Sequence, residues 1–116
     1  MNKAAFFLFS LLLAYGLFRP EPPPDLFYES DKFFHVGAFG VLALLSRMAF
    51  PSVPGWLMWG LLIAQAPFLE WMQHELQASR DFDYEDIIAN LCGVGAAFVV
   101  WCLRNVVWRR VEALLR

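Results

Sequence analysis

Four long apolar segments, separated by short polar stretches, constrain the fold of this chain more than any other feature of its sequence. A helix of about 17–25 residues spans a bilayer, and the second, third and fourth segments fall in that range. The first is shorter, and Asn2, Lys3 and Arg19 extend it to the membrane interface. The pattern predicts an all-α, polytopic membrane protein, a compact bundle of four transmembrane helices in a single domain, 1–116. The expected spans are about 4–19, 33–50, 55–72 and 87–108.

The composition points to the same environment. Hydrophobic residues make up 59% of the chain, above the roughly 45–50% of soluble domains, and the mean hydropathy is +0.50. The formal net charge of −2 argues against a nucleic-acid partner, which requires a basic surface. Cys92 and Cys102 share one apolar segment. On a helix they lie roughly 15 Å apart, too far for a disulfide, so we interpret both as small apolar residues.

The first segment has two interpretations. A charged residue before an apolar run, here Lys3, is typical of a signal peptide. However, the run ends in Phe18-Arg19-Pro20, and no small-residue cleavage site follows it. We therefore expect an uncleaved first span.

The distribution of Lys and Arg predicts the orientation, because cytoplasmic loops carry an excess of basic residues. If both termini are cytoplasmic, six of the nine basic residues lie inside. This N-in/C-in topology places the polar ends of the second, third and fourth segments together at the outer leaflet. The six inside residues are Lys3, Arg47, Arg104, Arg109, Arg110 and Arg116.

Short polar motifs occur at those ends, where ionisable groups are costly and usually functional. Asp31-Lys32-x-x-His35 opens the second segment. Asp31 and His35 are four residues apart and share a helix face. The motif is consistent with a carboxylate that orients an imidazole acting as an acid, a base or a ligand. The alternative is a helix N-cap at Asp31 and an interfacial histidine.

Two further motifs lie around the polar stretch between the third and fourth segments. Glu70 and Gln73 are three residues apart in an apolar context, so Glu70 is either a functional carboxylate or half of an ion pair between helices. Arg80 is the only cation between the two segments. It is suited to clamp a phosphate or carboxylate, and the alternative is a salt bridge to Asp86 or Glu70.

The fourth segment carries two kinds of stripe. Asp86, Asn90 and Gly93 follow an i, i+4, i+7 spacing and line one face. Asn90 lies about one turn inside the expected span, where it needs a hydrogen-bond partner. Ala89, Gly93 and Ala97 form a small-residue stripe that lets another helix approach closely, which indicates helix packing.

These motifs supply the candidate site. His35, His74, Glu70 and Asp86 carry atoms that bind metals, but no His-x-x-x-His or Cys-x-x-Cys pairing occurs, so we expect no metal and no cofactor. The candidate catalytic acid–base groups are Glu70, Asp86 and His35. The candidate ligand-binding residues are Asp31, Lys32, Gln73, Arg80 and Asn90.

The ordered set of motifs resembles the VanZ-like family of small bacterial membrane proteins. That family has Asp-Lys-x-x-His, then Glu-x-x-Gln, then Arg, Asp six residues on, Asn four after it and Gly three after that. The resemblance covers roughly residues 25–100, and the chain departs from it at 81–85, Asp-Phe-Asp-Tyr-Glu, where the family often has small residues. The matching residues are Asp31, Lys32, His35, Glu70, Gln73, Arg80, Asp86, Asn90 and Gly93.

The resemblance implies a four-helix, multi-pass protein of the bacterial cytoplasmic (inner) membrane, from a family linked to resistance against the glycopeptide teicoplanin. One hypothesis is that the polar residues bind, or bind and process, a membrane lipid or lipid-linked cell-wall precursor, with Arg80 and Lys32 holding its anionic headgroup. The second is a non-enzymatic structural or accessory protein whose polar cluster only fixes helix packing. A transporter is the weaker third, because the polar groups are confined to one end. Catalysis, oligomeric state and protein partners stay open.

Overall fold

Four helices make up the described part of the chain, which in this computed structural model comprises residues 2–19, 26–27, 30–77 and 82–116. The described residues contain no strand, so the all-α prediction is confirmed. Each of the last three helices is longer than the span expected from the apolar pattern, because polar residues at its ends continue the helical backbone. The helices are α1 (Asn2–Phe18), α2 (Ser30–Ala49), α3 (Gly55–Leu76) and α4 (Tyr84–Leu115).

The first turns of α4 and α2 differ in how Asp residues contribute to them. The Asp83 side chain caps α4 by accepting a hydrogen bond from the backbone N–H of Glu85 at 2.8 Å, which satisfies one of the exposed donors of the first turn. Helix α2 begins at Ser30, so Asp31 lies inside its first turn. The predicted N-cap role of Asp31 is therefore wrong, and its carboxylate instead faces the positive end of the helix dipole.

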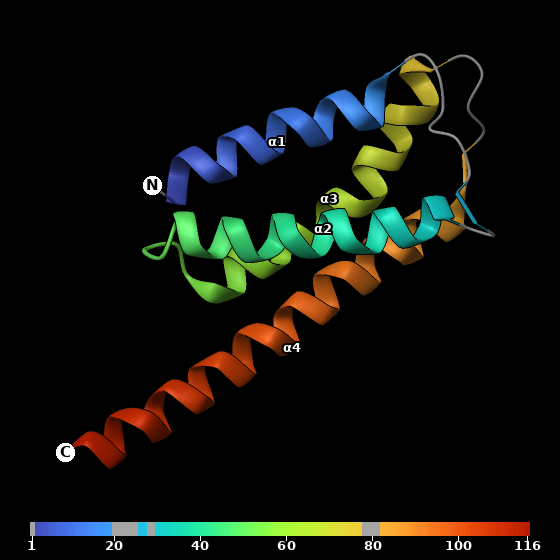
Figure 1. The fold of residues 1–116 in the computed structure, drawn as a ribbon. Coiled ribbons are helices and arrows are strands. Elements are labelled where there is room, and N and C mark those ends of the chain that lie inside the picture. The colour runs from blue at the N-terminus through green and yellow to red at the C-terminus, as the bar shows by residue number, and fades with distance from the viewer. Residues whose placement is uncertain (1, 20–25, 28–29, 78–81) are drawn as a thin grey trace.

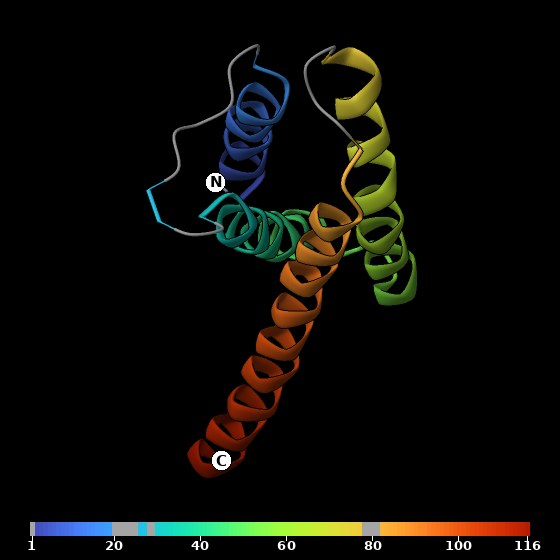
Figure 2. The same cartoon turned by 90° about the vertical axis from the view of Figure 1, so that its right-hand side faces the viewer.

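The helices bring their polar ends to one side of the molecule. The end of α1, the start of α2, the end of α3 and the start of α4 all lie at the right-hand end of the view in Figure 1. Helix α2 has its most extensive contact with α4, and α1 packs along α2. The C-terminal part of α4 projects away from the other helices in both views (Figures 1 and 2), and the molecule measures 58 × 28 × 23 Å.

The apolar core lies where α2 meets α4. Phe39 and Ala43 of α2 are fully buried, and Val94 and Ala97 of α4 pack in the same cluster. The backbones of α2 and α4 approach each other closely because Gly40 and Gly93 leave no side chain between them. The packing of these side chains holds α2 against α4. It thereby positions the polar residues at the start of both helices.

Among the described residues, two helices are long and apolar enough to cross a membrane, by length and composition. These are α2, with a mean hydropathy of 1.2 over its best window, and α4, with 1.9. Helix α1 is a shorter apolar helix. Large apolar side chains also cover the outer faces, among them Leu11, Trp56 and Val107.

Candidate functional site

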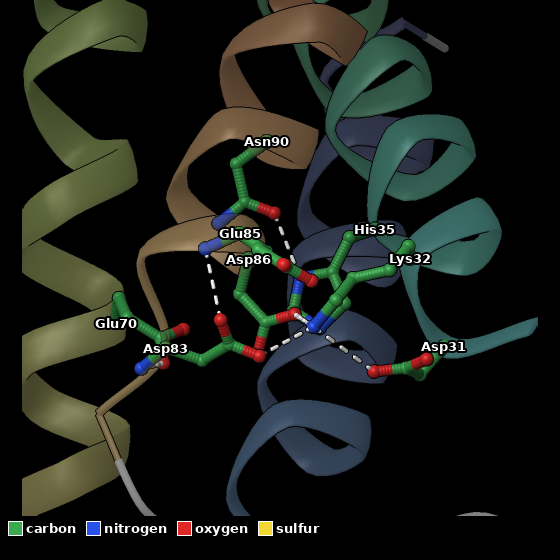
Figure 3. Close-up of polar contacts among 8 residues, drawn as sticks. All are labelled: Asp31, Lys32, His35, Glu70, Asp83, Glu85, Asp86 and Asn90. Carbon is green, nitrogen blue, oxygen red and sulfur yellow. Dashed lines mark hydrogen bonds and ion pairs between the residues drawn. The ribbon is translucent and has the colours of Figure 1, made fainter. Parts of the chain in front are cut away.

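A buried polar contact joins α2 to α4. His35 Nδ1 and Asn90 Oδ1 are 2.7 Å apart, and both side chains are buried (Figure 3). Because an amide oxygen only accepts hydrogen bonds, the imidazole donates from Nδ1 and leaves Nε2 as its acceptor in the neutral form. The ring of His35 also stacks parallel to Phe39, one turn further along α2. The histidine is therefore held on two sides in one orientation.

An ion-pair cluster lies next to this contact, centred on Lys32. Its Nζ is 2.5 Å from Asp86 Oδ1 and 2.5 Å from Asp83 Oδ2, and 3.4 Å from Asp31 Oδ2 (Figure 3). Asp86 is buried, whereas the Lys32, Asp83 and Asp31 side chains are 19%, 39% and 42% exposed. The cluster thus has a closed inner side at Asp86 and an accessible outer rim, formed by Asp31 and Asp83.

The lysine alters the titration of the rim. The hydrogen bond from Lys32 lowers the pKa of Asp83 below its ordinary value of 3.8, and the Glu85 N–H that this carboxylate accepts acts in the same direction. Desolvation opposes the shift but is smaller than the lysine's effect. Three carboxylates surround one ammonium group, so the positive charge of Lys32 is already balanced within the protein.

The polar residues of α3 tie the other elements to this end. Glu70, which is fully buried, accepts a hydrogen bond from the backbone N–H of Asp83 at 3.0 Å. Gln73 Nε2 donates to the carbonyl oxygen of Leu17 at 2.8 Å, and Gln77 Nε2 donates to the same oxygen at 3.0 Å. These bonds satisfy a carbonyl in the last turn of α1, which has no partner within its own helix.

The structure separates the predicted site residues into three groups. It gathers Asp31, Lys32, His35, Glu70, Asp86 and Asn90 around the start of α4. It turns Gln73 toward α1, away from the ion-pair cluster. Arg80 lies outside the described residues.

Two sequence interpretations change. Asp31 does not orient His35, because the imidazole pairs with Asn90 and the Asp31 carboxylate forms an ion pair with Lys32. Lys32 is not an open anion-binding group, because its ammonium lies among carboxylates. Both changes come from contacts between helices, which the spacing of residues along one helix does not encode.

The packing stripe lies where the sequence pattern puts it. Ala89, Gly93 and Ala97 are buried along one side of α4. Gly93 makes the closest approach, to the backbone of Val36 and Gly40 in α2.

Sequence reasoning missed Asp83 and Gln77. Asp83 precedes the first apolar residue of the fourth segment, Ile87, so the apolar pattern alone does not include it. An Asp followed by Tyr84, Glu85 and Asp86 is a recognisable helix start, since a capping side chain precedes an acidic first turn. Gln77 had no comparable signal, because its role depends on where α1 ends in space.

Within residues 2–19, 26–27, 30–77 and 82–116, no three His, Cys, Asp or Glu side chains are grouped so that they could hold a metal ion. The acidic side chains of the cluster instead share an ammonium group as their cation.

Comparison of the chain with protein-family models, with curated proteins and with solved structures found no match. The class of this protein therefore rests on its structure: the described residues form an all-α protein of four helices, with a buried polar cluster at one end. Membership of the VanZ-like family stays a prediction from the motif residues.

Proposed function

We propose that this chain is a VanZ-like, multi-pass protein of the bacterial inner membrane, with four spans and both termini in the cytoplasm. The exposed apolar side chains on the outer faces support a lipid environment, since a soluble surface rarely carries so many. The basic residues support the orientation. Arg47 and Arg104 both flank the ring of Trp101, at 5.7 and 4.8 Å from its centroid, far along α2 and α4 from the polar cluster.

At the outer leaflet, the polar cluster binds the headgroup of an envelope lipid or a lipid-linked cell-wall precursor. The observation that carries this proposal is the graded burial of one continuous cluster, closed on the inside at Asp86 and Asn90 and accessible at Asp31 and Asp83. Groups at such a rim meet the polar part of a lipid while its chains lie along the apolar helices. The family link to teicoplanin resistance fits an envelope ligand.

The charges of the rim shape what it binds. Because Lys32 is balanced by carboxylates, Asp31 and Asp83 are suited to accept hydrogen bonds from hydroxyl or amine groups of the headgroup. The anionic part of such a headgroup is bound by the guanidinium of Arg80, the other cation of the motif. Glu70, Asp86 and His35 are buried and already bonded to other elements. The proposal is therefore binding, without a catalytic step.

A second function is favoured by a specific observation. The bonds His35–Asn90, Lys32–Asp86 and Gln73–Leu17 each join two different helices. Such bonds brace the bundle, and a braced bundle without a ligand site is a structural or accessory membrane protein.

The two functions are separated by native mass spectrometry of the gently solubilised protein. Two headgroup variants, Asp31→Asn and Arg80→Ala, are compared with wild type, with the interior variant Asn90→Leu, and with Glu75→Gln, which changes an exposed carboxylate of α3 outside the cluster. A lipid that co-purifies with wild type and Glu75→Gln but is lost from both headgroup variants supports headgroup binding. A lipid content that is the same in both headgroup variants as in wild type, with a lower melting temperature only in Asn90→Leu, leaves the bracing function.

A further inference from the structure

A second polar feature lies away from the cluster, in a half-open cavity lined by α1, α2 and α3. The cavity has a volume of about 230 Å³. Its walls are mostly apolar and include Phe6, Leu42 and Leu69. It is larger than the engineered cavity of about 150 Å³ that holds a benzene molecule in another protein. An apolar ring or short chain therefore has room to enter.

Three polar side chains line this apolar space, one from each helix: Ser10, Ser46 and Gln65. The Ser46 hydroxyl donates to the backbone carbonyl of Leu42 at 2.7 Å and is satisfied. In contrast, the buried Ser10 Oγ and Gln65 Nε2 have no hydrogen-bond partner among the described residues. A buried donor without an acceptor is destabilising and rare in native proteins, so two such donors at one cavity require an explanation.

The chemistry of the two atoms restricts the ligand. An amide nitrogen donates and does not accept, and a hydroxyl donates readily. Neither side chain is charged, so a carboxylate or phosphate would enter an apolar cavity without a compensating cation, which is costly. A neutral acceptor oxygen on an otherwise apolar body meets both conditions.

We propose that this cavity binds an apolar molecule with a carbonyl oxygen, which accepts a hydrogen bond from Gln65 Nε2 or Ser10 Oγ. Two membrane components supply this chemistry: a quinone, with the carbonyl on a ring, and a fatty acyl ester, with the carbonyl on a chain. The site is separate from the headgroup site and does not require it. Leu17 lines the cavity, and its carbonyl oxygen accepts from Gln73, which is turned away from the ion-pair cluster.

The test compares two probes of almost equal shape, α-tetralone and tetralin, which differ by one carbonyl oxygen. They are titrated calorimetrically into the protein in lipid nanodiscs, with empty nanodiscs subtracted. We expect wild type to bind α-tetralone about fivefold more tightly than tetralin, the value of one hydrogen bond. That preference should disappear in Gln65→Leu or fall in Ser10→Ala. It should persist in Ser52→Ala, an exposed turn position that matches the chemistry of the second change.

Folding does not confound these variants, because neither Gln65→Leu nor Ser10→Ala removes a hydrogen bond seen in the described residues. Equal binding of the two probes by wild type, no binding of either, or a preference that survives in both variants would each overturn the proposal. Mass spectrometry of the organic extract of purified protein distinguishes the two sources. A quinone or an acyl ester enriched on wild type and lost from Gln65→Leu names the ligand class, and identical extracts contradict the proposal.

Discussion

Gly93 of α4 lies directly against the carbonyl oxygen of Val36 in α2, with no room for a side chain between the two helices. This contact fixes how far α2 and α4 are rotated and shifted against each other. It is one turn from Asn90 on α4 and next to His35 on α2, so the polar pair meets because the backbones touch. The packing stripe and the polar cluster are thus one structural unit.

The first prediction concerns this contact. A methyl group at Gly93 would overlap the Val36 carbonyl, and it would also lie 3.0 Å from the backbone nitrogen of Gly40, so Gly93→Ala must push the helices apart. We expect a loss of about 1–3 kcal/mol in stability, as for other overpacked positions. The measurement is thermal unfolding in detergent.

Gly95 offers a matched control on the same helix. A Cβ at Gly95 meets nothing within 4 Å, so Gly95→Ala should be neutral, or stabilising by about 0.5–1 kcal/mol through helix propensity. If the two substitutions have the same effect, the close approach of α2 and α4 is not what holds the bundle.

The second prediction concerns the buried pair His35–Asn90. Asn90→Ala removes the acceptor and leaves the imidazole N–H buried, so we expect a loss of about 1–3 kcal/mol. A double-mutant cycle with His35→Ala measures the coupling, which should be about 0.5–3 kcal/mol for residues in contact. Additive effects of the two single changes would show that the pair does not interact.

The third prediction concerns the ammonium group at the centre of the ion pairs. In Lys32→Met, the buried Asp86 carboxylate loses its lysine partner, and we expect a loss of about 3–5 kcal/mol. Adding Asp86→Asn to this variant removes the buried charge and should restore part of the lost stability. Unfolding curves of the single and double variants provide the measurement. A double variant less stable than Lys32→Met would argue against charge burial as the cause.

The fourth prediction concerns pH. The Lys32 hydrogen bond depresses the pKa of Asp83 in the folded protein below its ordinary value of 3.8. The stability from this interaction is complete above about pH 4, the pKa range of an unfolded Asp. It is lost as the pH falls through the lower, folded-state pKa. Asp83→Asn should therefore weaken the dependence of stability on pH below about 4.

The control for the pH experiment is Glu75→Gln, which changes an exposed carboxylate of α3. Its melting temperature should fall with acidification as steeply as that of wild type. A wild-type profile in Asp83→Asn would mean that the Asp83–Lys32 pair is not formed in solution. Because Asp83 is partly exposed, added salt should also reduce the effect by screening.

The sequence by itself determined the all-α class, because long apolar segments with helical lengths leave few other folds. It also determined which ends of the helices carry polar residues. Because short connections make successive helices alternate in direction, those ends were expected to lie on the same side of the bundle. The small stripe at Ala89, Gly93 and Ala97 was equally readable, because its spacing follows the turn of one helix.

Only the tertiary structure decided which side chains are partners. Helical periodicity puts Asp31 and His35 on one face, but the imidazole bonds to Asn90, and Lys32 bonds to Asp83 and Asp86. These choices depend on the rotation and depth of α4 against α2, which are set by contact between two backbones more than fifty residues apart. Spacing along a chain describes one helix at a time, and a site between helices is fixed by how they pack.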